Sequence, residues 1–432
     1  MEITRQLSEA VFDARARTLA LVADLSDDQL FGPRLPTVNP LHWEIGHIGW
    51  FQESWILRHA LGRPPIREDG DRLYDSSAIP HDVRWDLPLP SRGRTIEYLL
   101  HTRDLVQKQL SRADFPESAR YFVHLTIAHE DMHDEAIILT RQTLGYPPPA
   151  ELASLQVVAE GEGDLAPGDA EIPAGSFLLG SAVGEEVFIH DNEKWAHSVD
   201  LDAFAIARAP VTQAEFAHFV DSGGYQEPAY WSEPGWQWRS LASAEHPVYW
   251  RRSATGWQRR HFDEWKPLEP RWPMVHVNWF EAEAYCRFAG RRLPSEAEWE
   301  VAASASPADG GGLAARKRRY PWGSEYPRPQ RAHLDVTRQG CIDVAALPRS
   351  DSAFGCRQMI GNVWEWTHTP FMPYPGFSAD PYRDYSQPWF GSHKVLRGGC
   401  WATRSRLIRN TWRNFYTPER RDIIAGFRTC RL

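Results

Sequence analysis

The feature that most constrains the fold is a long stretch, residues 121–144, that contains neither proline nor glycine. Its apolar residues recur at roughly helical spacing, and Gly145, followed closely by a run of prolines, provides a natural end, so we predict a helix. On this helix His129 and His133 are four residues apart, so both imidazoles project from one face, one turn apart. That arrangement suits a divalent transition metal with nitrogen ligands.

The histidine pair has three possible interpretations. It satisfies the H-E-x-x-H pattern of zinc proteases, in which Glu130 would be the general base. It can instead belong to a site of three histidines whose third ligand lies on another helix. The pair can also be two surface or core histidines that happen to lie four residues apart. The motif alone does not separate these interpretations, so the rest of the chain must.

The chain before this helix predicts three more helices. Residues 3–25 mix apolar and charged side chains in the manner of an amphipathic helix. A second helix is expected to begin at Asn39-Pro40, with asparagine as the N-cap, and a third covers about residues 93–112. The connection 63–92 shows no clear periodicity, and a loop of this length is usually functional or disordered. The prediction is a four-helix bundle, in which metal sites are built from side chains on facing helices.

His47 is the candidate for the third ligand. It lies in the middle of the second helix among large apolar residues, so it is expected to face inward. An isolated inward histidine is more often a hydrogen-bonded core residue, but here a second helix supplies a histidine pair. We therefore predict that His47, His129 and His133 bind one metal ion; His42 is a weaker candidate.

The composition changes after the bundle. Residues 151–170 are small, acidic and rich in glycine and proline, which predicts a linker between a first domain at residues 1–150 and a second at 171–432. In the second domain, short apolar runs alternate with long irregular segments rich in tryptophan, proline and glycine. Three helices are expected to begin at a capping residue that is followed three residues later by glutamate: Thr212, Asn278 and Ser295. We predict an irregular α+β domain held together by aromatic packing.

Charge and composition exclude several classes of protein. The net charge of -9 argues against non-specific nucleic-acid binding. No apolar run approaches the ~20 residues of a membrane span, and the N-terminus lacks the apolar core of a signal peptide. We therefore expect a cytoplasmic protein with no membrane partner. The five cysteines are widely spread and form no C-x-x-C pair, so a zinc ribbon is not expected. The oligomeric state is left open.

Seven segments of the second domain form a specific series: 210–216, 273–282, 292–300, 320–323, 361–366, 396–401 and 426–428. Together they resemble the formylglycine-generating-enzyme (sulfatase-modifying-factor) fold, and the first domain resembles the DinB-like helical bundle. This order of domains resembles the ergothioneine-type sulfoxide synthases, non-haem iron enzymes that use O2 to join sulfur to C2 of the imidazole of hercynine (Nα-trimethylhistidine). The resemblance implies Fe(II) held by His47, in the Trp-x-x-x-His segment, and by His129 and His133.

Departures from the family pattern fall on the donor and proton-transfer positions. Mycobacterial-type members hold the carboxylates of γ-glutamylcysteine with an Arg-x-x-Arg pair, and the matching residues here are His81 and Arg84, so one guanidinium clamp is lost. The glutamine before the second histidine of the pair is Met132. The family's proton-donating tyrosine corresponds to His393, and its C-terminal Trp-Asp to Arg431-Leu432.

These departures predict a different chalcogen donor. The segment from Asn39 to Glu53 and the loop after it most resemble the selenoneine synthases, which couple a selenosugar to hercynine, and a neutral sugar needs no arginine pair. The alternative is a sulfoxide synthase that joins cysteine or γ-glutamylcysteine to hercynine. A further alternative is a non-catalytic ligand-binding module. Formylglycine generation needs a reactive cysteine pair, and Cys400 and Cys430 do not form a close one.

Several residues receive candidate roles beside the metal. Tyr74 and His393 are candidate proton donors. Aromatic faces that could hold the trimethylammonium of hercynine are expected from three residues, Trp401, Trp412 and Phe415. His81, Arg84, Met132 and Arg431 are candidate substrate contacts. Three acidic residues of the last bundle helix could orient the ligand imidazoles: Glu130, Asp131 and Glu135.

Overall fold

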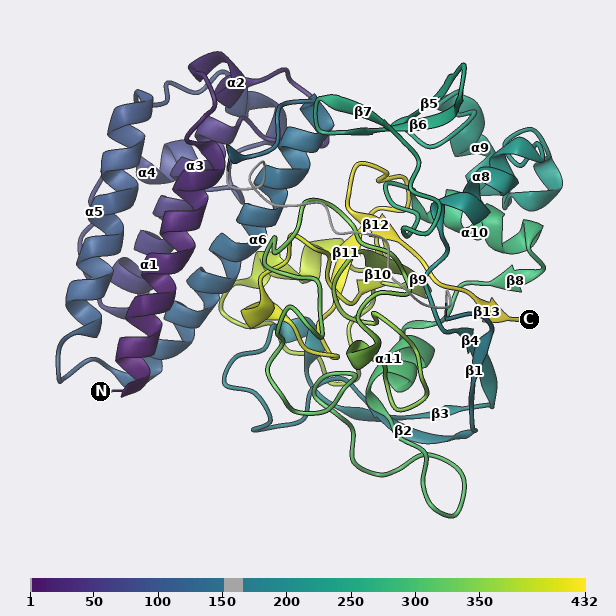
Figure 1. Ribbon diagram of the computed structural model, residues 1–432. Helices are drawn as coiled ribbons and strands as arrows, with labels where there is room; N and C mark the ends of the chain where they lie inside the picture. Colours follow the sequence, from purple (N-terminus) through teal and green to yellow (C-terminus); the bar gives the residue numbers. More distant parts are fainter. Residues whose placement is uncertain (1, 151–165) are drawn as a thin grey trace. The chain divides into compact units, whose positions relative to one another are not determined.

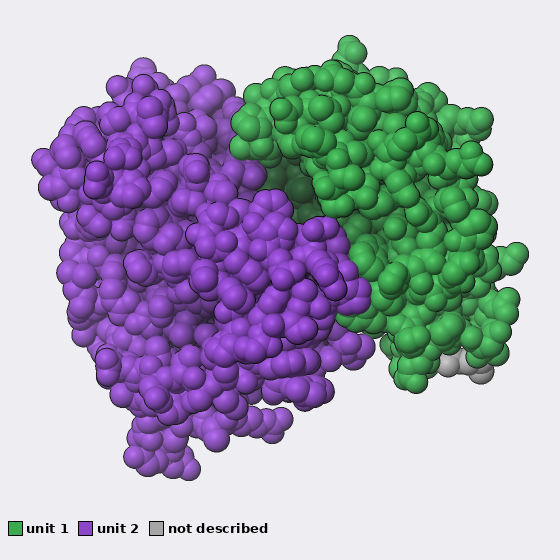
Figure 2. All heavy atoms as spheres, turned by 180° about the vertical axis from the view of Figure 1, so that it is seen from behind, with its two compact units in different colours: residues 1–154 green, residues 155–432 purple. Residues whose placement is uncertain are grey.

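The computed structural model of the protein describes residues 2–150 and 166–432. The chain divides into two compact units, residues 1–154 and 155–432 (Figures 1 and 2). Most of the predicted linker, residues 151–165, lies outside the described residues, and strand β1 (Asp169–Ile172) begins within the last part of it. None of the described helices is both long enough and apolar enough to cross a membrane.

The first unit is the predicted four-helix bundle (Figure 1). Its long helices are α1 (Glu2–Val22), α3 (Leu41–Gln52), α5 (Arg92–Leu110) and α6 (Arg120–Leu144). Helices α1 and α3 each pack against both α5 and α6. A cluster of buried aliphatic side chains, including Val11, Ile56, Val106 and Val123, forms the core between them. Gly145 ends α6 in the left-handed conformation, as its position in the sequence predicted.

Three details of the bundle differ from the prediction. Asn39 does not cap α3, because the helix begins at Leu41 and the Asn39 side chain instead accepts a hydrogen bond from Arg84. Helix α3 continues as a π-helical segment, Glu53–Ala60, rather than ending in regular α-helix. The connection 63–92 is partly ordered: it contains α4 (Gly70–Tyr74) and a 3-10 turn, His81–Trp85. Two further short elements are α2 (Asp27–Phe31) and a 3-10 turn at Glu117–Ala119.

The second unit is α+β, as predicted, and its sheets are small (Figure 1). One sheet has the order β1-β4-β13-β8, with β4 (Phe204–Ala207), β13 (Cys430–Arg431) and β8 (Arg291–Arg292) beside β1. The other four-stranded sheet has the order β11-β10-β9-β12: Asn414–Tyr416, Lys394–Arg397, Trp364–Pro370 and Ala425–Gly426. A hairpin joins β2 (Gly175–Leu179) to β3 (His197–Leu201), and a third group comprises β5 (Trp250–Ser253), β6 (Gly256–His261) and β7 (Glu264–Pro267).

The described part of this unit also contains four α-helices: α8 (Gln213–Asp221), α9 (Glu233–Leu241), α10 (Trp279–Phe288) and α11 (Glu296–Ser304). The three predicted capping boxes are confirmed. Thr212, Asn278 and Ser295 each accept a hydrogen bond from the backbone N–H three residues later, and each following glutamate bonds back to the cap.

The motifs that carry the family resemblance build the scaffold of this unit. Arg397 is fully buried, and its guanidinium pairs with Glu296 at 2.8 Å and with Glu300 at 2.6 Å. Gly398 follows with a φ of 95°, and a Cβ there would lie 2.5 Å from the Met359 carbonyl oxygen, so only glycine fits. These residues therefore hold the core together.

Candidate metal centre

The three predicted histidines lie together in the first unit. Helix α3 supplies His47, α6 supplies His129 and His133, and their ligand atoms all lie within 4.8 Å of one another. The Nε2 atom of His129 is 3.3 Å from Nε2 of His47 and 3.2 Å from Nε2 of His133. Nitrogen ligands of one transition-metal ion, with bonds of about 2.0–2.1 Å, lie at comparable mutual distances.

Two of the imidazoles are oriented through their other ring nitrogen. His47 Nδ1 lies 2.8 Å from the Tyr74 carbonyl oxygen. A carbonyl only accepts, so this nitrogen carries the proton and Nε2 of the neutral ring presents a lone pair. His133 Nδ1 makes the same kind of bond, 2.7 Å long, to the Glu44 carboxylate.

This donor set fits a cation. Burial lowers the pKa of His47 well below its ordinary value, and the nearby His133 adds to the effect, so the His47 ring is neutral. The Nε2 atoms face one another at just over 3 Å, and a cation bound between them would take their lone pairs. Three imidazole nitrogens are ligands that suit iron, zinc, copper or nickel.

Aromatic rings enclose the histidines. The indole of Trp43 stacks on His47 with ring centres 5.0 Å apart, and the phenyl ring of Phe51 stacks on His129 at 3.6 Å. All four side chains project from α3 and α6, so the packing of these two helices helps to orient the two imidazoles. Rigid neighbours of this kind keep ligand rings in place when no metal is bound.

Glu44 is a member of the site that the sequence reasoning missed. It is 1% exposed and lies three positions before His47 on α3, so the two side chains share a helix face. That spacing could have revealed it. Glu130, predicted as an orienting acceptor, faces α1 instead, where Arg15 Nε bonds its carboxylate at 2.7 Å. The carboxylate that orients the metal-binding His133 of α6 is therefore Glu44, from the facing helix α3.

We predict that Glu44→Gln weakens metal binding by about 10- to 100-fold, the usual cost of losing an outer partner of a ligand histidine. The amide keeps the shape of the side chain but loses the negative charge that makes His133 Nε2 a stronger electron-pair donor to the metal. Anaerobic titration with Fe(II) measures the effect. Glu97→Gln, which removes the same charge from a side chain that is 66% exposed on α5, is the matched control. Equal affinities of the two variants would contradict this role of Glu44.

The contacts of Glu130 also argue against the zinc-protease interpretation of the histidine pair. Its side chain is 1% exposed, forms a two-point ion pair with Arg15, and accepts a hydrogen bond from Thr18. A carboxylate held in this way cannot reach a metal-bound water as a general base. The H-E-x-x-H pattern therefore arises here from two metal-facing histidines and one glutamate that packs against another helix.

The other predicted residues of the first unit have different surroundings, and Tyr74 contacts the ligand histidine His47 directly. Tyr74 contributes its carbonyl, while its ring is fully buried and burial raises the pKa of the hydroxyl. The Arg84 guanidinium lies 4.0 Å from the centre of the Trp43 ring, on which it stacks. His81 Nε2 bonds the Val38 carbonyl oxygen at 2.7 Å. Met132 is half-buried beside His133 in the sequence.

The predicted residues of the second unit do not form one group. Trp401 and Trp412 are 4% and 3% exposed, so little of either ring is left for a ligand. Phe415 is half-buried and stacks on Phe371 with ring centres 4.0 Å apart. His393 packs edge-on against Phe415, and burial lowers its pKa. Arg431 lies at the surface, where it pairs with two acidic side chains, Asp169 and Glu171.

The cysteines are not suited to formylglycine chemistry. All five are buried, and none of them forms a disulfide bond. Burial raises the pKa of Cys356 to about 11 and that of Cys341 to about 12, so these thiols are not nucleophilic near neutral pH. Buried thiols of this kind pack as small apolar residues.

Comparisons with known proteins match both units. The sulfatase-modifying factor enzyme 1-like domain matches residues 156–432, and the DinB superfamily matches residues 12–137. The chain is 38% identical over 431 residues to a hercynine oxygenase of Mycolicibacterium thermoresistibile, covering 98% of this chain and 94% of that one. It is 39% identical over 432 residues to a hercynine oxygenase of Mycobacterium tuberculosis, covering 99% of each chain. A formylglycine-generating enzyme of Streptomyces coelicolor is 32% identical over 60% of this chain and 88% of its own length.

Proposed function

We propose that this chain, which belongs to the hercynine oxygenase family, is an Fe(II)- and O2-dependent enzyme that bonds a chalcogen to C2 of the hercynine imidazole. The observation that carries the proposal is the convergence of three imidazole Nε2 atoms from α3 and α6. The names of the relatives, which cover nearly the whole chain, support hercynine as the substrate.

His47, His129 and His133 would hold the metal ion, which, when bound, supplies the one-electron chemistry that O2 requires. Three protein ligands leave positions free for other groups, as in other open non-haem iron sites. The Tyr74 carbonyl and the Glu44 carboxylate keep the protons of His47 and His133 on Nδ1. Trp43 and Phe51 exclude water from the faces of the rings.

For the donor, we propose a selenosugar. The two residues at the family's carboxylate-binding positions, His81 and Arg84, already form hydrogen bonds with other groups of this chain. These bonds support a donor without carboxylates. His81 bonds the Val38 carbonyl, and the Arg84 guanidinium bonds the Asn39 side chain and the carbonyls of two loop residues. A dicarboxylate such as γ-glutamylcysteine would have to displace these bonds.

One observation favours a thiol donor instead. Nε of Arg84 is buried and has no hydrogen-bond partner among the described residues, so one donor of this guanidinium remains free for a carboxylate. Cysteine, which carries a single carboxylate, would suit one such donor better than γ-glutamylcysteine would.

The proton-transfer roles are also proposals. Because burial raises the pKa of Tyr74, its hydroxyl is a weaker acid than a free tyrosine, and we assign Tyr74 a positioning role through its carbonyl. His393 remains the candidate proton donor. Its half-buried ring has a lowered pKa and bonds Ser392 Oγ at 2.8 Å. Phe415, which packs against His393, remains the candidate face for the trimethylammonium.

The test is a donor comparison. The protein is loaded with Fe(II) without oxygen, then exposed to O2 with hercynine and, in parallel, a selenosugar, γ-glutamylcysteine or cysteine, and the products are weighed by mass spectrometry. We expect a hercynine product that carries selenium. Turnover with thiols alone would contradict the selenosugar assignment but would still agree with the proposed bonding of a chalcogen to hercynine. No loss of hercynine with any donor would overturn the reaction class and favour a binding module.

A further inference from the structure

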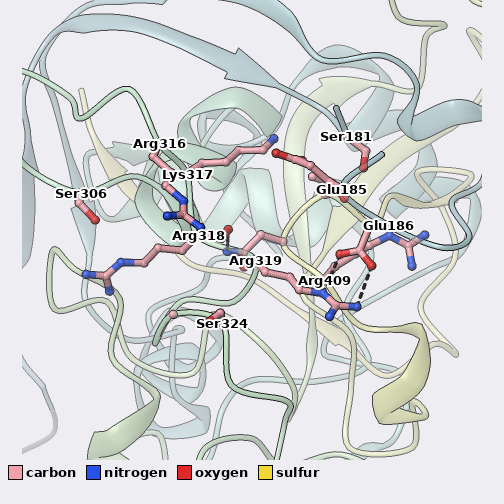
Figure 3. A pocket seen from close by; sticks show the side chains of 13 residues that line it. Ser181, Glu185, Glu186, Ser306, Arg316, Lys317, Arg318, Arg319, Ser324 and Arg409 are labelled. Atoms are coloured by element: carbon pink, nitrogen blue, oxygen red, sulfur yellow. Dashed lines mark hydrogen bonds and ion pairs between the residues drawn. The ribbon is translucent and has the colours of Figure 1, made fainter. Parts of the chain in front are cut away.

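A cavity lies within the second unit, lined by residues that have no role in the sites described above. It has a volume of about 510 Å³, within the range of about 300–1,000 Å³ that is typical of small-molecule sites. Five cationic side chains and two acidic ones line it: Arg316, Lys317, Arg318, Arg319, Arg409, Glu185 and Glu186. Four of the cations are consecutive in the sequence, and Figure 3 shows one of them, Arg319, joined to Glu186 by dashed lines.

Three of these cations are already neutralised. Lys317 Nζ bonds Glu300 at 2.9 Å, Arg319 pairs with Glu186 at 2.6 Å, and buried Arg409 forms a two-point pair with Glu193. Each pair fixes one wall of the cavity. A ligand does not need to displace any of them.

The other two cations remain available. Arg316 is exposed and forms no hydrogen bond or ion pair with the described part of the chain. Arg318 uses one nitrogen, Nη1, to bond the Pro321 carbonyl oxygen at 2.9 Å, which leaves the rest of its guanidinium free. Two guanidinium groups beside a cavity match the charge and shape of a doubly charged oxyanion.

Two buried polar atoms beside the cavity indicate which hydrogen-bonding groups a ligand should carry. Ser181 and Asn410 both line the cavity and are each 1% exposed. Ser181 Oγ and Asn410 Oδ1 have no hydrogen-bond partner among the described residues, although Asn410 Nδ2 donates to the Arg318 carbonyl at 3.1 Å. Buried polar atoms are rarely left without a partner. Asn410 Oδ1 can only accept, so the missing group there must be a donor such as a hydroxyl.

We infer that this cavity binds a small phosphomonoester that also carries hydroxyl groups. Arg316 and Arg318 would take the phosphate, and the Ser181 hydroxyl and the Asn410 carbonyl oxygen would take the hydroxyls. The walls are held by ion pairs that do not depend on the histidines of the first unit, so this site and the metal centre are separate. The cavity is too small for a nucleic acid or a protein partner.

Calorimetric titration of the full chain with glucose 6-phosphate tests the assignment, with glucose and inorganic phosphate as comparison ligands. We expect glucose 6-phosphate to bind more tightly than either. The double variant Arg316→Ala/Arg318→Ala should weaken its binding by at least about tenfold, since charge-assisted bonds are lost. Arg383→Ala removes an exposed guanidinium that does not line the cavity and should leave binding within about twofold.

Ser181→Ala tests the contact with the ligand's hydroxyl groups independently of the contact with its phosphate. Because the hydroxyl has no partner in the described chain, its removal should not disturb folding. We expect several-fold weaker binding of glucose 6-phosphate and unchanged binding of inorganic phosphate. His47→Ala should bind glucose 6-phosphate as the wild type does. Binding of glucose 6-phosphate that is no tighter than that of glucose, or unaffected by the double arginine change, would overturn the inference. Equal affinity for inorganic phosphate would do the same.

Discussion

Replacing His47 by alanine should strongly weaken Fe(II) binding, whereas replacing His42 by alanine should leave it intact. Both histidines lie on α3, but only His47 places an Nε2 atom beside His129, at 3.3 Å. His42 Nε2 instead lies 3.1 Å from Thr95 Oγ1. Loss of one of three ligands should lower the affinity by more than about 100-fold, beyond the 10- to 100-fold cost of losing an outer partner.

The comparison uses anaerobic titration with Fe(II) and the metal content of the purified variants. Both substitutions shorten a side chain on the same helix and could destabilise it. Thermal unfolding of both variants without metal therefore checks that the bundle remains folded. Iron bound at wild-type affinity by the His47 variant would remove His47 from the site. Equal loss in the two variants would point to general damage to α3 rather than to a lost ligand.

Gly46→Ala should damage the metal centre although Gly46 carries no side chain. A Cβ at this position would lie 2.2 Å from Cε1 of Tyr74 and 2.5 Å from Cζ, well inside van der Waals contact. The Tyr74 ring must therefore move, and with it the carbonyl that accepts the Nδ1 proton of His47. We expect Fe(II) affinity to fall at least tenfold, and the free energy of unfolding to fall by about 1–3 kcal/mol, as for other overpacked cores.

Gly49→Ala is the matched control, since Gly49 lies on the same helix three residues later. A Cβ there would lie 3.2 Å from the end of the Leu99 side chain, which can shift by a few tenths of an ångström. This variant should keep its metal affinity. If Gly46→Ala and Gly49→Ala bind Fe(II) equally well, the link between the Tyr74 carbonyl and the metal centre is wrong.

The sequence predicted the bundle well because its signals are local. Apolar periodicity and the glycine after residue 144 placed the last helix, and helical spacing placed His129 and His133 on one face. The cap of α3 was wrong because Asn39 has a distant partner, Arg84, 45 positions away. A competing contact of this kind is not visible in a local pattern.

The rest of the site depends on contacts between distant residues. Glu44 meets His133 across 89 positions of sequence, and Arg15 removes Glu130 from the metal side across 115. The sheet order of the second unit, in which β13 lies between β4 and β8, likewise has no local signal. The four consecutive cations at 316–319 resemble a solvated charged run in sequence, and only folding shows which of them are paired.

X-ray absorption at the iron edge of the Fe(II)-loaded protein tests the central claim most directly. The account predicts one iron per chain with three histidine imidazoles among its ligands, seen as the multiple-scattering pattern of three rings at the usual iron–nitrogen distance. In His47→Ala loaded at high iron concentration, the pattern should decrease to two rings. A wild-type spectrum with fewer than three imidazoles, or one unchanged by His47→Ala, would contradict it.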